Sequence, residues 1–153
     1  MRINEAPVHA SLAAIDLERA RSWYADKLGW EPTREAPGLL VYQVLGSDFT
    51  LFETPNAGTA KNTVMNWNVP DVAPEVARLR ANGVEFEDYD FGEYRTTDGI
   101  MADPSGGKSA WFKDSEGNII GRFVSTGIRP HFADRMKHSG GEVDPSALGF
   151  LRP

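Results

Sequence analysis

In the first half of the chain, the pattern of apolar and polar residues predicts a series of strands and one helix. Residues 7–15 combine small and apolar side chains in the manner of a strand, and residues 17–28 carry apolar side chains at helical spacing. Two further apolar runs, 39–45 and 49–54, flank turn residues at 46–48. We expect a strand, a helix, a short strand at 30–34, and then a hairpin.

The same order returns in the second half. Residues 62–69 are typical of a strand, residues 72–82 of a helix, and residues 84–89 of another strand. A second hairpin is predicted from 109–113 and 118–124. Residues 90–107 are rich in Gly, Pro, Thr and Asp, which indicates a long excursion before that hairpin.

Helix-boundary residues repeat at nearly the same offset. Asp16 and Asp71 precede the two helices, and Gly29 and Gly83 end them, so the interval between the Asp residues almost equals the interval between the Gly residues. This near-constant offset indicates a duplication. We predict an α+β fold of two tandem βαβββ modules, 7–56 and 62–125, that form a curved mixed sheet around a shared cleft within a domain 1–126.

Composition and charge narrow the classes of partner. Lys and Arg number 16 and Asp and Glu number 22, which gives a net charge of −6 without a basic run. We therefore expect neither a nucleic-acid partner nor a membrane partner. The chain has no Cys, which excludes thiolate metal sites and fits a cytoplasmic location.

Sequence motifs for hydrolysis and nucleotide chemistry are absent. The chain has no Gly-x-Ser-x-Gly, no phosphate-binding loop and no His-Glu-x-x-His. In the C-terminal extension, 127–153, His131 and His138 lie on either side of Asp134. We interpret these residues as a solvated surface rather than a metal site, in an extension of loops or with a short helix near 130–137.

Three segments carry a resemblance to a known superfamily. They are HASLAAIDLERARSWYADKLG (9–29), the block 68–86, and AWFKDSEGNIIGRFV (110–124). Together they resemble the vicinal oxygen chelate superfamily, which includes glyoxalase I, bleomycin-resistance proteins and extradiol dioxygenases. The resemblance covers about residues 7–125 and implies the same paired-module fold.

The resemblance also implies where a metal would be bound. The four ligand positions of metal-dependent members fall on His9, Phe52, Val64 and Gly121, and only His9 keeps a ligand side chain. Glu53 follows Phe52, and strand alternation turns it to the opposite face unless a bulge intervenes. A divalent cation needs three or four donors, so we expect no metal and no cofactor.

The replaced positions indicate an apolar pocket for a small organic molecule. Phe52 and Val64 add apolar wall, Gly121 leaves space, and the segment 94–103 is a candidate lid over the cleft mouth. The predicted ligand-binding residues are His9, Ser11, Tyr42, Phe52, Val64, Asn66, Tyr94, Met101, Trp111, Gly121 and Phe123.

The resemblance favours a metal-free protein that binds a small apolar or aromatic molecule, as the bleomycin-resistance branch does, and that forms a homodimer. One alternative is a metal-dependent lyase, isomerase or dioxygenase that uses His9. Another is a regulatory or assembly subunit whose cleft is vestigial. His9 also has a purely structural interpretation, as a strand histidine. We interpret Trp23, Tyr24 and Trp67 as core residues, and Asp114 and Glu116 as turn residues.

Overall fold

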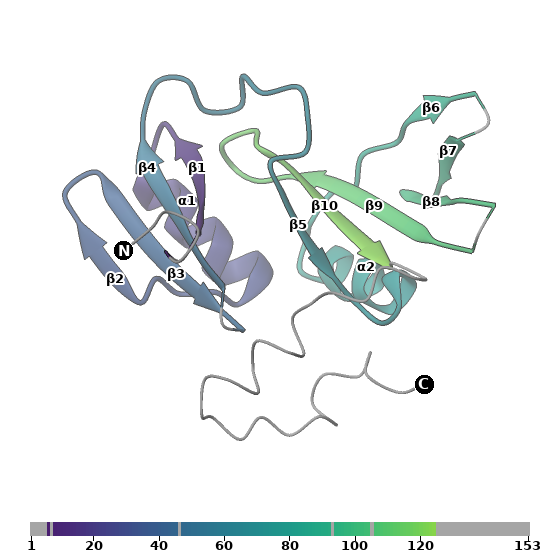
Figure 1. Cartoon of the computed structure of the whole chain (residues 1–153), viewed down its shortest axis with the longest axis horizontal. Coiled ribbons are helices and arrows are strands. Elements are labelled where there is room, and N and C mark those ends of the chain that lie inside the picture. The colour runs from purple at the N-terminus through teal and green to yellow at the C-terminus, as the bar shows by residue number, and fades with distance from the viewer. Residues whose placement is uncertain (1–5, 7, 46, 93, 105, 125–153) are drawn as a thin grey trace.

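Each half of the chain forms one β-sheet with one helix packed against it (Figure 1). This structure, a computed structural model, describes residues 6, 8–45, 47–92, 94–104 and 106–124. The first half contains β1 (Ala10–Ala14), α1 (Leu17–Trp23), the π-helical turn η2 (Tyr24–Leu28), β2 (Arg34–Ala36), β3 (Leu39–Val44) and β4 (Ser47–Glu53). The second half contains β5 (Met65–Asn68), α2 (Val72–Ala81), β6 (Asp90–Phe91), β7 (Tyr94–Thr97), β8 (Ile100–Ala102), β9 (Lys108–Lys113) and β10 (Ile119–Val124). The α+β class and the two βαβββ modules are confirmed.

Both helices begin directly after the predicted Asp residues, whereas their ends differ slightly from prediction. α1 ends at Trp23 and is continued to Leu28 by η2, and α2 ends at Ala81, two residues before Gly83. The carboxylates of Asp16 and Asp71 each accept a hydrogen bond from a backbone N–H of the first helical turn, at 2.9 and 3.2 Å. Gly29 and Gly83 follow the helices with φ of 72° and 79°. Glycine adopts this left-handed conformation without the steric penalty of a Cβ, so it ends a helix readily.

The two sheets share a strand order but remain separate. The first sheet has the order β1-β4-β3-β2, and the second has the order β5-β10-β9-β8-β7-β6. In each sheet the first two strands are parallel, and the other neighbours are antiparallel. In contrast to the expected single curved sheet, β1 and β5 each pair with one strand within the described part of the chain. Within the described residues both edges of each sheet are therefore open, at β1 and β2 in the first and at β5 and β6 in the second.

The predicted excursion is part of the second sheet. β6, β7 and β8 extend the sheet beyond β9, and the turn Asp98-Gly99 joins β7 to β8 (Figure 1). The strand predicted at 84–89 is reduced to a bridge between Phe86 and Phe112 and a hydrogen bond from Glu87 N to Trp111 O. The first half of β9, from Lys108 to Ala110, pairs with β8 instead.

The larger of two apolar clusters joins the two modules. Its fully buried side chains come from the helix-facing side of both sheets, for example Leu51 from β4 and Ile120 from β10. Trp23 packs on Phe112 with ring centroids 6.0 Å apart, and other aromatic rings make similar contacts between the modules. Because both helix-facing sides point into this core, the opposite faces of the sheets point away from it.

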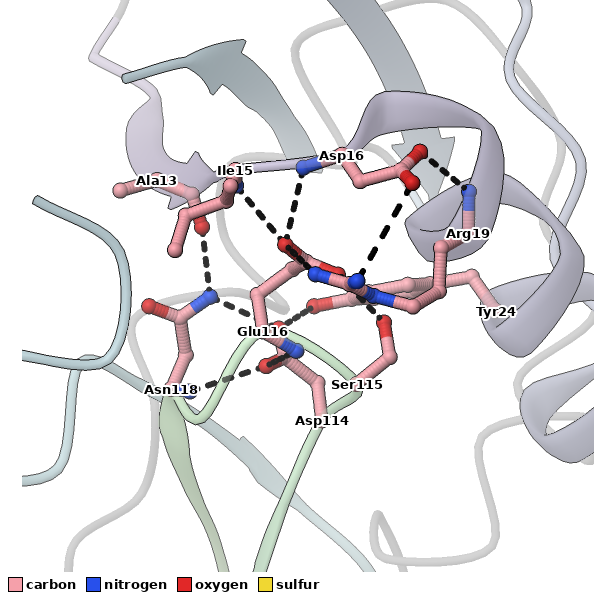
Figure 2. Close-up of polar contacts among 9 residues, drawn as sticks. All are labelled: Ala13, Ile15, Asp16, Arg19, Tyr24, Asp114, Ser115, Glu116 and Asn118. Atoms are coloured by element: carbon pink, nitrogen blue, oxygen red, sulfur yellow. Dashed lines mark hydrogen bonds and ion pairs between the residues drawn. The ribbon is translucent and has the colours of Figure 1, made fainter. Parts of the chain in front are cut away.

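The β9–β10 turn also attaches the second module to the first (Figure 2). The buried carboxylate of Glu116 accepts hydrogen bonds from the backbone N–H groups of Ile15 and Asp16, at 2.7 and 3.1 Å, and from Arg19 Nε at 2.8 Å. Arg19 Nη2 donates a further bond at 2.9 Å. These bonds hold the turn against the start of α1.

Asp114 and Asn118 complete this attachment (Figure 2). Tyr24 Oη donates to Asp114 at 2.9 Å, and Asn118 Nδ2 donates both to Asp114 and to Ala13 O at 2.8 Å. Asp114 and Glu116 are thus turn residues, as predicted, and they also connect the modules.

The two turn carboxylates differ in acidity because their surroundings differ. Burial raises the pKa of Asp114, although hydrogen bonds from Asn118 and Tyr24 oppose this effect. Burial acts in the same direction on Glu116, but hydrogen bonds from Arg19 and two backbone N–H groups outweigh it and lower the pKa of Glu116.

The C-terminal extension 127–153, with His131, Asp134, His138 and the predicted short helix, lies outside the described residues. Among the described residues, no helix has the length and apolar character needed to cross a bilayer.

Candidate functional site

The first sheet exposes a face of small, apolar and hydroxyl side chains, which we call face A. Because Leu12 and Ala14 are buried in the core, alternation places Ser11 and Ala13 on the opposite side. Face A comprises Ser11, Ala13, Leu39, Val41, Thr50 and Phe52, which the strand registers bring together. Thr50 Oγ1 donates to Ser11 Oγ at 3.1 Å, and Phe52 is 39% exposed.

The second sheet has a corresponding face, which we call face B. It comprises Thr63, Asn66, Tyr89, Met101, Ser109, Trp111 and Gly121. Trp111 lies on this face, while its neighbour Phe112 lies in the core. Trp111 Nε1 donates to Thr63 Oγ1 at 3.2 Å, and the Trp111 ring meets the Tyr89 ring edge-on at 5.6 Å.

Gly121 does not leave the expected open space. A Cβ built on Gly121 would lie 2.6 Å from Asn66 Oδ1 and 3.1 Å from both Thr63 Cγ2 and Trp111 Nε1. The neighbouring side chains thus already cover the backbone at this position. A large side chain at Gly121 would have to displace them, which corrects our expectation of a vacant hollow.

Val64 differs from its expected position by one residue. Its N–H donates to Ile119 O at 2.9 Å, and its side chain packs against the core. Thr63 instead lies beside Gly121 and Trp111. A hydroxyl group therefore occupies the place on face B for which the sequence predicts an apolar wall.

Tyr42 is not a wall residue. It is fully buried on the helix-facing side of the first sheet, where its ring stacks on Phe49 at 4.8 Å and lies 5.5 Å from Tyr24. Tyr42 alternates with the face A residues of β3, so it cannot reach that face. Burial raises the pKa of Tyr42 to about 12.

The segment predicted as a lid is built into the sheet. Met101 pairs with Ser109 between β8 and β9 and is nearly buried. Tyr94 pairs with Phe91 at the far edge of the second sheet and is 46% exposed. Phe123 lies in β10, and its side chain is outside what the structure describes.

The four positions implied for a metal do not fit a divalent cation. Phe52, Val64 and Gly121 offer no side-chain donor, and His9 is an exposed residue that precedes β1. The register from Ala10 with Phe49 to Ala14 with Glu53 is one to one, so no bulge turns Glu53 toward face A. Within the described ranges, no group of three or more His, Asp or Glu side chains could hold a metal ion.

The residues predicted for one cleft thus divide between two faces. Ser11 and Phe52 lie on face A, whereas Asn66, Met101, Trp111 and Gly121 lie on face B. Because the helix-facing sides share the core, the two faces point away from each other within one chain.

Sequence reasoning missed several residues of these faces. Thr50 and Thr63 form hydrogen bonds there, and Tyr89 and Phe91 add stacked rings. Of these, only Tyr89 and Phe91 carry a sequence signal: Tyr89 ends the strand-like run 84–89 and Phe91 stands two residues further on, at the spacing that places side chains on one face of a strand.

Comparisons with solved structures identify the fold. A glyoxalase/bleomycin resistance protein from Catenulispora acidiphila matches with a TM-score of 0.58 and 22% identity, over 79% of this chain and 99% of that one. A lactoylglutathione lyase from Agrobacterium tumefaciens matches with a TM-score of 0.61 and 19% identity, over 82% and 97% of the two chains. A bleomycin-binding protein, crystallised with bleomycin, matches with a TM-score of 0.60 and 15% identity, over 78% and 98%.

At these identities the structural matches support the fold alone. No curated protein sequence matches the chain. A profile of one superfamily, however, matches residues 6–120, which is most of the chain. The chain therefore belongs to the Glyoxalase/Bleomycin resistance protein/Dioxygenase superfamily.

Proposed function

We propose that this protein binds a small apolar or aromatic molecule without a metal ion, in clefts that two copies of the chain form together. The observation that carries the proposal is the composition of the two faces. Face A offers Phe52 with the hydroxyl groups of Ser11 and Thr50, and face B offers Trp111 with the side-chain amide of Asn66. Aromatic walls with a few uncharged polar groups are typical of sites for small organic ligands.

The proposal includes a second copy because, within a single chain, each face supplies only one wall of a cleft. β1 borders face A and β5 borders face B, and both strands have an open edge within the described residues. Open strand edges favour pairing with another chain. In a two-fold dimer, β1 of one copy and β5 of its partner lie side by side, which joins face A to the partner's face B at two equivalent places.

Metal chemistry is not part of the proposal because the donor set is too small. A cytoplasmic location fits a chain without Cys.

The experiment combines oligomeric state with ligand retention. We expect light scattering to give twice the mass of one chain, and native mass spectrometry after incubation with an aromatic metabolite mixture to retain a ligand. Phe52→Ala on face A and Asn66→Ala on face B should each weaken retention by about 5-fold or more. Asn56→Ala, at another exposed asparagine, is the matched control.

Two results would overturn the proposal. One is a monomer that retains no ligand, which fits the alternative of a vestigial cleft. The other is a stoichiometric transition metal in the purified protein that disappears in His9→Ala, which indicates the metal-dependent enzyme.

A further inference from the structure

The sequence contains one Asn-Gly pair, Asn82-Gly83, and it lies where α2 ends against the first module. Asn82 is the C-terminal cap of α2, and Gly83 follows with a φ of 79°. Asn82 Nδ2 donates to the backbone oxygen of Lys27 in η2 at 3.0 Å. Both residues of the pair are exposed. The side-chain amide of Asn82 therefore connects the two modules at a place that water can reach.

An Asn-Gly pair can lose its side-chain amide without an enzyme. The backbone nitrogen of the second residue attacks Cγ of the Asn, and Gly has no Cβ to hinder that approach. A bond forms between Gly83 N and Asn82 Cγ while the Cγ–Nδ2 bond breaks, and Nδ2 leaves as ammonia with the proton of Gly83 N. Water then opens the five-membered succinimide ring at either carbonyl, which gives aspartate or isoaspartate. Water is the only co-reactant.

The fold holds Asn82 in a conformation that cannot close this ring. Its ψ of 3° places Gly83 N beside the backbone nitrogen of Asn82 rather than beside the side chain. Gly83 N also donates to Arg80 O at 2.8 Å, and Asn82 Nδ2 is engaged with Lys27 O. Both hydrogen bonds must break, and the backbone must rotate, before the nitrogen reaches Cγ. The reaction therefore needs a local opening at the end of α2.

The product cannot restore the contact with Lys27. A carboxylate has no donor, so only acceptors would face the Lys27 carbonyl oxygen. It also adds a negative charge at the C-terminus of α2, where the helix dipole disfavours it. Lys27 Nζ is close, since a Cβ on Gly83 would lie 3.0 Å from it, but an exposed ion pair compensates little. Each conversion therefore weakens this attachment irreversibly.

We propose that Asn82-Gly83 is a self-modification site, at which the folded protein slowly loses the amide that connects α2 to η2. The fold controls the rate, because only molecules in which the end of α2 is open can react. This inference is independent of ligand binding and of the oligomeric state.

The test follows the amide of Asn82 with time in the full chain. Folded protein and protein unfolded in guanidinium chloride are incubated at pH 8 and then digested with trypsin. The peptide 81–95 contains Asn82 and no other Asn, so its mass reports conversion, and chromatography separates isoaspartate from aspartate. We expect conversion in both samples, about 10-fold slower or more in the folded protein. Asn56, which is exposed and followed by Ala57, is the internal control and should keep its amide.

Two variants separate the reaction from its structural effect. Asn82→Gln keeps an amide on a longer side chain, which closes a ring far more slowly, so its peptide 81–95 should stay unconverted. Asn82→Asp reproduces the aspartate product and should lower the thermal midpoint by about 2–4 °C. Asn56→Asp adds the same charge at an exposed position in the connection between the modules, and as the matched control it should leave the midpoint unchanged.

Three results would overturn the inference. Equal rates in the folded and unfolded samples would show that the fold does not control the reaction. An intact Asn82 in the folded protein after many half-times of the unfolded chain would show that the folded protein does not modify itself. A thermal midpoint of Asn82→Asp equal to that of Asn56→Asp would show that the amide does not hold the modules together.

Discussion

Two fully buried tyrosines differ in what their hydroxyl groups contact. Tyr24 Oη donates to Asp114 at 2.9 Å, whereas Tyr42 Oη has no hydrogen-bond partner among the described residues. A buried hydroxyl without a partner lowers stability, and a buried carboxylate that loses a donor does the same. The same substitution should therefore have opposite effects at these two positions.

We expect Tyr24→Phe to lower the free energy of unfolding by about 2 kcal/mol and Tyr42→Phe to leave it unchanged or raise it by up to about 1 kcal/mol. Urea unfolding followed by tryptophan fluorescence measures both values, and each variant is the control for the other because both lose one buried oxygen. Equal destabilisation by the two variants would show that the Asp114 contact has no special role.

The two turn carboxylates predict how stability depends on pH. The pKa of Glu116 is lowered in the folded protein, so its stabilising contribution is complete above its ordinary range and is lost as pH falls through the folded value. The pKa of Asp114 is raised, so its contribution has the opposite sign: it is complete at low pH and is lost as pH rises through the folded value.

Glu116→Gln should therefore change the pH profile as well as the stability. At pH 7 we expect a loss of about 2–3 kcal/mol, because a charged acceptor of several hydrogen bonds is replaced by a neutral one. Between pH 5 and pH 3 the wild-type urea midpoint should fall more steeply than that of the variant. Parallel profiles would contradict the assigned role of the Glu116 carboxylate.

At the scale of elements, two glycines separate backbone strain from contact between segments. Gly58, in the connection between the modules, and Gly29, after η2, have nearly the same φ, 70° and 72°. A Cβ on Gly58 would lie 2.6 Å from Glu116 O and 3.3 Å from Gly117 Cα, whereas a Cβ on Gly29 has no neighbour within 4 Å. Of these two glycines, only Gly58 lies against the β9–β10 turn.

Gly29→Ala should lower the free energy of unfolding by about 1 kcal/mol through conformational strain alone. Gly58→Ala should lower it by about 2–4 kcal/mol, because the turn that joins the modules must also move. Thermal unfolding of both variants measures the difference. Equal losses would mean that the connection does not press on the turn.

Local signals explain which elements the sequence could predict. Asp caps, Gly ends and turn-flanked apolar runs act over a few residues, so the helices and both hairpins agree with prediction. The run 84–89 has equally good strand residues, but β8 pairs with the first half of the neighbouring strand β9, and no local sequence pattern indicates that competition.

The site was harder to predict because strand faces were ambiguous. β3 reads LLVYQV, which is apolar on both faces along most of its length, so alternation could not assign Tyr42 to one side. For Phe52 and Glu53 the polarity differs between neighbours, and their expected faces agree with the structure. Val64 precedes β5, where strand alternation does not hold, and this explains its displacement by Thr63.

At the scale of the whole molecule, the shared core decides how the two faces can be used. The helix-facing sides of both sheets contribute to one core, together with side chains of α1 and η2, so face A and face B of one chain point apart. If the cleft forms between copies, Ser11 on β1 lies near Asn66 on β5 of the partner. A crosslink between these positions should then form between chains.

Because the chain has no Cys, the introduced cysteines are the only thiols that can react with the crosslinker. We expect a mixture of Ser11→Cys and Asn66→Cys chains, treated with a short bis-maleimide, to give a crosslinked species of twice the chain mass on denaturing gels. The control mixture replaces Asn66→Cys with Ser22→Cys, at an exposed position of α1, and should crosslink several-fold less. Equal yields from the two mixtures would indicate random encounter, and two-fold pairing of β1 with β5 would then be wrong even if light scattering reports a dimer.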